Sequence, residues 1–129
     1  MFPVNSTWRF PMTTQTYTLF MLLKTTRRWL DLEPKDRFAF IKENVNPILE
    51  AHPTVSMRFF DTESYTARIS DIVVWKTSDL VAYQGVIKGL RDTIFWDHYF
   101  EVLEIIPAVE DGYAAYYAMN PLTGSAQAG

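Results

Sequence analysis

The segment Tyr17–Thr25, YTLFMLLKT, constrains the fold of this chain more than any other stretch. Read as a strand, it is apolar on both faces, with Leu19, Met21 and Leu23 on one face and Phe20 and Leu22 on the other. A strand of this kind is covered by other elements on both sides. A chain of 129 residues has room for one domain with a real core. Because such a domain rarely supplies both covers, we expect one cover to come from another chain.

Hydrophobic periodicity predicts two long helices and three further strands in the rest of the chain. The first helix begins at Pro34 and ends near His52, with its apolar stripe formed by Phe38, Ile41, Val45 and Ile48. Pro47 is expected to kink it. The second helix runs from a cap at Thr77 or Ser78 to about Asp92. We expect strands at 54–61, 67–76 and 100–106, a turn at 62–66, a short helix at 110–119 and a helical turn at 27–30.

Two glycines four residues apart, Gly85 and Gly89, lie inside the second predicted helix. They weaken that helix but allow a neighbouring helix to approach closely, so tight packing is the expected reason for them. His52, at the end of the first helix, is expected to complement the helix dipole rather than to act on a ligand.

The resulting order is strand, helix, strand, strand, helix, strand, which predicts an α+β domain of the ferredoxin-like β-α-β-β-α-β type. Its sheet is antiparallel, and both helices cover the same face. The simplest cover for the other face is a second copy of the chain, as in dimeric α+β barrels, so we predict a homodimer with an isologous contact. We expect this domain at 17–119, an N-terminal extension at 1–16 whose Trp8 and Phe10 dock on the surface, and a tail at 120–129.

Composition excludes several functional classes. The net charge of −3, without a long basic run, argues against a nucleic-acid-binding protein. The chain has no cysteine, and its two histidines are far apart in sequence, so we expect neither a disulfide nor a metal site. No motif for a cofactor is present. No apolar run is long enough to cross a membrane, and no signal peptide is recognisable, so we expect a cytoplasmic protein.

Several motifs resemble those of one known family. They are Tyr17–Thr26, Trp29-Leu30, Pro47-Ile48-Leu49, His52-Pro53, Arg58-Phe59, Ser70-Asp71 and, above all, Phe95-Trp96-Asp97-His98-Tyr99-Phe100-Glu101. Over roughly residues 15–117 the sequence is similar to the darcynin family of bacterial proteins. The resemblance supports the fold just described. It implies no particular activity and no catalytic residues, because none is settled for that family.

The predicted hairpin suggests where a ligand would bind. With a turn at 63–66, Arg58 lies opposite Asp71, and these two residues share one mixed face with Ser56, Phe60, Val73 and Trp75. The companion face, formed by Val55, Met57, Phe59, Ile72 and Val74, is expected to pack on the helices. One choice of register adds Phe20, Leu22, Lys24, Phe100, Val102 and Glu104 to the mixed face. The candidate pocket therefore consists of Phe20, Lys24, Arg58, Phe60, Asp71, Trp75, His98 and Glu104.

Several interpretations of these residues stay open. Arg58 with Asp71, and Lys24 with Glu104, form either cross-strand ion pairs at the dimer seam or acid–base groups of a site. His98 is either a proton shuttle or part of a structural joint. Three functions follow: a homodimer that binds a small molecule, with cofactor-independent catalysis on an aromatic metabolite as an extension; a non-catalytic interaction module; and, third, a haem protein with His52 or His98 as iron ligand.

Overall fold

The computed structural model describes residues 15–122, so Trp8, Phe10 and the end of the predicted tail lie outside the described residues. It contains one antiparallel sheet of four strands in the order β2-β3-β1-β4. The strands are β1 (Tyr17–Thr25), β2 (Ser56–Asp61), β3 (Asp71–Thr77) and β4 (Phe100–Ala108). This order and the connections between the strands confirm the predicted ferredoxin-like fold.

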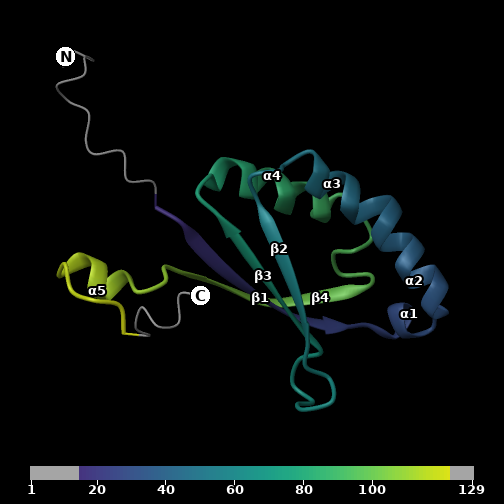
Figure 1. Ribbon diagram of the computed structural model, residues 1–129. Helices are drawn as coiled ribbons and strands as arrows, with labels where there is room; N and C mark the ends of the chain where they lie inside the picture. The colour runs from purple at the N-terminus through teal and green to yellow at the C-terminus, as the bar shows by residue number, and fades with distance from the viewer. Residues whose placement is uncertain (1–14, 123–129) are drawn as a thin grey trace.

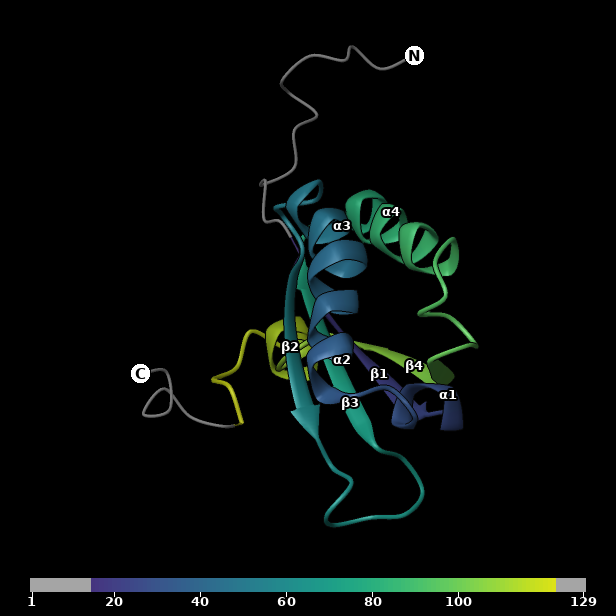
Figure 2. The ribbon, with the colours of Figure 1, turned by 90° about the vertical axis from the view of Figure 1, so that its right-hand side faces the viewer.

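The helical segments lie mainly on one side of the sheet (Figures 1 and 2). The first predicted helix is built from α2 (Pro34–Phe40), a π-helical turn η2 (Ile41–Val45) and α3 (Asn46–Glu50), and the second is α4 (Leu80–Arg91). A short α1 (Arg27–Leu30) follows β1, and α5 (Gly112–Tyr116) stands apart from the other helices beyond the end of β4 (Figure 1). Within residues 15–122, no helix has both the length and the apolar character needed to cross a membrane.

Local sequence explains where these helices begin and change form. Pro34 occupies the first turn of α2, where its missing amide is not needed. Pro47 cannot donate a backbone hydrogen bond to the preceding turn, and the π-helical turn lies directly before it, at the place where the sequence predicts a kink. The N-cap of α4 is Asp79 rather than Thr77 or Ser78, because its Oδ1 accepts a hydrogen bond from the Ala82 amide at 3.0 Å.

The core lies between the sheet and the helices. Leu19, Met21 and Leu23 of β1 are buried there, together with Val73 and Trp75 of β3, Val86 and Leu90 of α4, and Phe95 and Phe100. The close helix packing predicted from the glycines is confirmed. A Cβ atom at Gly85 would lie 2.4 Å from Nε2 of His52, and one at Gly89 would lie 3.2 Å from the Ile48 side chain.

The predicted register of the hairpin is wrong. Asp61 pairs with Asp71, and Arg58 pairs with Val74. The turn is longer than the predicted 62–66, because the Thr62 amide donates to the Ser70 carbonyl at 2.9 Å and the chain from 62 to 70 forms one loop. The third strand therefore begins at Asp71 rather than at residue 67.

This shift exchanges the two faces of β3. Val73 and Trp75 lie on the helix-covered face, opposite Phe59 and Met57. Ile72 and Val74, expected under the helices, lie on the open face. Of the residues expected under the helices, Met57 and Phe59 of β2, and Val55 before it, keep the predicted side.

The predicted parity of β4 holds only in part. Glu104 pairs with Leu22 on the open face, as expected. The register shifts between Leu22 and Leu23, however, so that Val102 and Phe100 point into the core. A one-residue irregularity of this kind turns every later side chain to the opposite face.

Candidate functional site

An apolar pocket of about 350 Å³ lies between the helix α2–η2–α3 and the helix-covered face of the sheet. We call it the helix–sheet pocket. The residues that line it are Trp29, Pro34, Arg37, Phe38, Ile41, Val45, Met57, Phe59, Val73, Trp75, Leu90, Phe95 and Phe100. Its volume is in the range of small-molecule sites, which are mostly apolar with a few polar groups.

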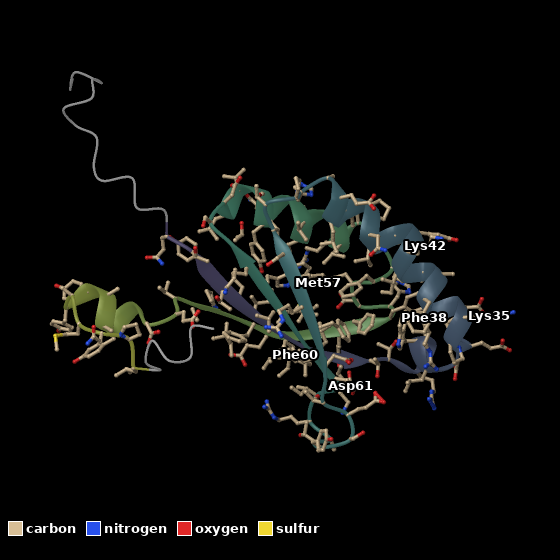
Figure 3. All side chains as sticks on the ribbon, viewed as in Figure 1. Lys35, Phe38, Lys42, Met57, Phe60 and Asp61 are labelled. Carbon is tan, nitrogen blue, oxygen red and sulfur yellow. The ribbon has the colours of Figure 1, made fainter. Side chains whose placement is uncertain are left out.

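The walls of the pocket come from both the sheet and the helices. The sheet supplies the floor through Met57 and Phe59 of β2 and Val73 and Trp75 of β3, which pair in register. Residues of α2 and η2 supply the roof. Phe38 of α2 is 76% exposed and Phe59 of β2 is partly exposed, so these two residues mark the mouth. Figure 3 labels Phe38 on α2 and Met57 on β2, the two elements that the mouth separates.

One end of the pocket is closed by stacked aromatic rings. The Trp29 ring lies 4.8 Å from the Phe100 ring and 5.3 Å from the Tyr99 ring, measured between centroids, and Phe95 stacks on Phe100 at 4.6 Å. Phe40 adds an edge-to-face contact with Tyr99 at 4.8 Å. Aromatic pairs in these geometries are favourable beyond their buried area. This end of the pocket is therefore a rigid wall.

Arg37 is the only ionisable side chain in the lining given above. It is half-buried, and its guanidinium spans the C-terminal end of α1: Nε donates to the Trp29 carbonyl at 3.2 Å and Nη2 donates to the Leu30 carbonyl at 3.0 Å. Among residues 15–122, no carboxylate lies within salt-bridge distance of it; the ion pair found there joins Arg27 and Asp31.

Of the residues predicted to form the pocket, Trp75 alone lines it. Trp75 is 1% exposed, and its Nε1 has no hydrogen-bond partner among residues 15–122. The hydroxyl of Tyr83, whose ring lies 6.3 Å from that of Trp75, is also buried and has no partner within this part of the chain. Burial raises the pKa of the Tyr83 hydroxyl. Because Trp75 belongs to the helix-covered face, the prediction that it shares a face with Arg58 is wrong.

Asp71 also lies on the opposite face from Arg58, so the predicted ion pair between them does not form. The Asp71 side chain is 6% exposed, and its Oδ2 accepts a hydrogen bond from Ser70 Oγ at 2.7 Å. Burial raises the pKa of the Asp71 carboxyl, against the opposing effect of the Ser70 hydrogen bond, and the negative charges of Asp61 and Glu63 raise it further.

The open face keeps the rest of the predicted group. Phe20, Arg58, Phe60 and Glu104 lie on it, and the Arg58 guanidinium stands 5.1 Å above the centre of the Phe60 ring. The predicted pair of Lys24 with Glu104 does not form, because Lys24 is in register with Glu101 and its Nζ donates to the Ala67 carbonyl at 2.7 Å.

Neither histidine lines the helix–sheet pocket. His98 is exposed, its Nδ1 contacts Arg28 Nη1 at 2.5 Å, and its carbonyl accepts a hydrogen bond from Thr26 Oγ1. His52 Nδ1 lies 2.8 Å from the Ile48 carbonyl in the last turn of α3, where a dipole-complementing role was predicted. These positions place His98 in a joint between α1 and β4, and they provide no iron ligand inside the pocket.

Sequence reasoning missed Arg37, Phe38, Met57 and Phe59 as pocket residues. A signal for Arg37 existed, because it lies next to Phe38 and four residues before Ile41, and both of these belong to the apolar stripe of the predicted helix. Met57 and Phe59 were assigned to the correct face, but that face was expected to be filled by the helices.

Comparisons with known proteins agree with this fold. The model of the family described as "Darcynin, domain of unknown function" matches residues 2–126, a wider span than the resemblance over 15–117. A darcynin homolog of Granulibacter bethesdensis is 46% identical over 101 residues, which cover 78% of this chain and 82% of that protein. One from Streptomyces avermitilis is 45% identical over 106 residues, covering 81% of this chain and 88% of that protein.

Similar solved structures are chlorite dismutases. A variant of the enzyme from Candidatus Nitrospira defluvii gives a TM-score of 0.65 at 15% identity, covering 87% of this chain and 46% of that chain. The dimeric enzyme of Nitrobacter winogradskyi gives 0.62 at 13% identity, covering 77% of this chain and 60% of that chain. This chain thus spans about half the length of these structural neighbours, and at such identities the likeness concerns the fold alone. The family match and the identities above establish that the chain belongs to the darcynin family, whose function is unknown.

Proposed function

We propose that this protein binds a small, largely apolar molecule in the helix–sheet pocket and works as a homodimer. The observation that carries the proposal is the pocket itself: about 350 Å³ lined by aromatic and aliphatic side chains, with a mouth between α2 and β2. A flat aromatic body would contact Phe38, Phe59 and Trp29. The cytoplasmic location expected from the sequence stays a prediction.

Binding is favoured over catalysis by the composition of the lining. Arg37 is its only ionisable side chain, and a guanidinium offers donors but no acceptor atom for the proton of a substrate, so the lining contains no general base. The haem alternative is not supported by this pocket, since none of its lining residues is a histidine. We therefore propose a binding or carrier role, without a chemical step.

The dimer would form through the open face of the sheet. Two rows of side chains cross that face in register: Arg58, Val74, Phe20 and Ile106, and next to them Phe60, Ile72, Leu22 and Glu104. Phe20, Phe60 and Ile106 are partly exposed. An uncovered apolar belt of this kind marks an interaction surface.

The charges on this belt suggest how two copies meet. Arg58 lies on the edge strand β2, and Glu104 lies on the opposite edge strand β4. If the two sheets pack face to face about a two-fold axis along the strands, β2 of each copy lies over β4 of the other. Arg58 of one copy then approaches Glu104 of its partner, twice in each dimer.

Calorimetric titration with 2-naphthamide, a neutral bicyclic aromatic, tests the binding proposal. We expect saturable binding at one site per chain. Ile41→Trp should abolish it, because the larger ring fills the roof of the pocket. Ile94→Trp makes the same change at an exposed position outside the lining and should leave binding intact. The absence of binding to the wild type, or equal loss in both variants, would contradict the proposal.

An interaction module remains a second candidate because of α5. The Tyr117 ring lies 4.9 Å from the Tyr113 ring in a tilted geometry and 4.9 Å from the Tyr116 ring edge to face; all three tyrosines are exposed, as are Met119 and Leu122. A variant with serine in place of the three tyrosines tests the two functions separately. If it still binds 2-naphthamide, the pocket works independently of α5. Loss of a co-purifying partner protein in that variant, with the pocket inert in the wild type, would favour the module.

A further inference from the structure

We infer that the ligand of the helix–sheet pocket is an organic anion, an apolar body with one carboxylate or similar head group, and that Arg37 recognises this head group. The inference rests on the proposed function and specifies its ligand class. The lining of the pocket is apolar apart from a single cation, Arg37. A charge in an apolar wall is costly unless an opposite charge or several hydrogen bonds accompany it.

Arg37 is only partly compensated within the chain. Its Nε and Nη2 donate to the Trp29 and Leu30 carbonyls, whereas Nη1 has no partner among the described residues. The nearest acidic candidate on the facing strand is Asp61, whose side chain extends from the same face of β2 as Phe59. Asp61 is engaged in its own turn, where its Oδ1 accepts the Glu63 amide at 3.0 Å, and it forms no salt bridge with Arg37.

The two backbone contacts also hold the guanidinium in place. They use one edge of its planar group and leave the other edge with donors in a fixed orientation. An arginine restrained in this way suits the two oxygens of a carboxylate, because the side chain loses little freedom when the ligand binds.

Two further cations lie on the same helical segment as Phe38, which marks the mouth. Lys35 lies three residues before Phe38 and Lys42 four residues after it, and Figure 3 labels all three along α2 and the π-helical turn. Asp36, two positions from Phe38, points to the other side of the helix. A cationic rim around an apolar opening raises the local concentration of anions and guides them inward.

Two other places in the molecule, an acidic cluster and a polar surface hollow, do not indicate a ligand. Three acidic residues lie together where β3 begins: Asp61, Glu63 and Asp71. An acidic cluster by itself identifies no ligand. The polar surface hollow formed by Gln15, Thr16, Thr18, Lys76, Glu110 and Asp111 is open and contains both a cation and carboxylates. Neither combines an apolar pocket with a cation that keeps a free donor, as the helix–sheet pocket does.

The test compares 2-naphthoate with 2-naphthamide, which share the same bicyclic body and differ in charge at neutral pH. Wild-type protein should bind the anion at least tenfold more tightly in calorimetry, as one charge-assisted hydrogen-bonded contact predicts. Arg37→Gln should remove the preference for 2-naphthoate, so that the variant binds the acid and the amide with similar affinity. Arg37→Lys should retain part of the preference, because it keeps the charge and loses the planar fork.

Arg68→Gln is the matched control, since it removes one positive charge from the exposed loop after β2 and should affect neither ligand. Equal affinity of the wild type for both ligands would overturn the anion assignment and leave the proposed binding function standing. Loss of both ligands in Arg37→Gln would mean that Arg37 only supports α1, which also overturns the assignment. Failure of the wild type to bind either ligand would overturn the proposed function and this inference together.

Discussion

At the scale of single residues, contacts far apart in sequence determine which side chains can change. Gly85 of α4 faces the His52 ring, which is itself held by the contact of Nδ1 with the Ile48 carbonyl. Asp71 is a carboxyl group that the fold has buried beside two other acidic residues. At Gly85 and at Asp71, the stability of the fold therefore depends on neighbouring residues that cannot be identified from their spacing in the sequence.

Gly85→Ala should destabilise the protein by about 1–3 kcal/mol, the usual cost of overpacking, although alanine is the better helix former. Urea unfolding measures this change. The cost should shrink in a His52→Ala background, where the ring that a Cβ atom would meet is absent. Gly89→Ala is the control and should cost less, because the neighbouring Ile48 side chain is 3.2 Å away and can adjust. An equal cost in both backgrounds would contradict the assigned contact.

Asp71→Asn should make the protein more stable relative to wild type as the pH rises. The folded-state pKa of Asp71 is raised above its ordinary value of 3.8, so folding holds the proton more tightly than the unfolded chain does. The contribution of Asp71 to wild-type stability is therefore fully present below the unfolded pKa and is lost as pH rises through the folded pKa. The asparagine variant lacks this decline and can still accept from Ser70.

Urea unfolding at several pH values between 4 and 8 measures the difference between the two proteins. Glu50→Gln, at the exposed end of α3, serves as the control and should follow the wild type. Parallel profiles for Asp71→Asn and wild type would show that the buried carboxyl does not contribute to the pH dependence.

At the scale of elements, short helices depend on the residues that attach them to the sheet. The four residues of α1 are too few to form a stable helix alone. Trp29 attaches α1 to Phe40, Tyr99 and Phe100, and the Arg28–His98 contact links it to the joint before β4. The segment Phe95–Glu101, which carries the family resemblance, therefore acts as the anchor for α1 and the closed end of the pocket.

Trp29→Ala should destabilise the protein by about 3 kcal/mol, because it removes the ring that joins α1 to the aromatic wall. Leu30→Ala, in the same helix but 42% exposed, should cost about 1 kcal/mol or less. Thermal and urea unfolding compare the two variants. Similar losses in both would show that α1 contributes through its backbone rather than through Trp29.

At the scale of the whole molecule, the main question concerns the open face of the sheet, which carries apolar side chains although the helices pack on the other face. Helices α2, α3 and α4 lie on one side of the sheet (Figure 2), and within residues 15–122 none of these helices covers the belt from Arg58 to Glu104 on the other side. The apolar residues Phe20 and Leu22 of β1 lie in the middle of that belt. They are the residues from which a second cover was predicted.

Light scattering should give twice the 15.0 kDa mass of one chain at micromolar concentration. Arg58→Glu and Glu104→Arg should each weaken the dimer by about tenfold or more, since each places like charges together at the seam. The double variant restores opposite charges and should recover the dimer. Lys88→Glu on α4 is the control and should remain dimeric. A monomeric wild type, or a double variant no better than the single ones, would contradict the proposed arrangement.

The sequence by itself determined the order and type of the main elements, because hydrophobic periodicity, Pro34 and the two helical glycines act over a few residues. It also determined that β1 would be apolar on both faces. The tertiary structure alone decided which face each residue of β3 and β4 occupies. The long loop at 62–70 and the register shift after Leu22 set those faces, and a shift of one residue reverses them. The tertiary structure also decided where the pocket lies, because its walls come from four segments that are distant in sequence. Arg37 lines the pocket because α2 packs across β2 in the folded chain.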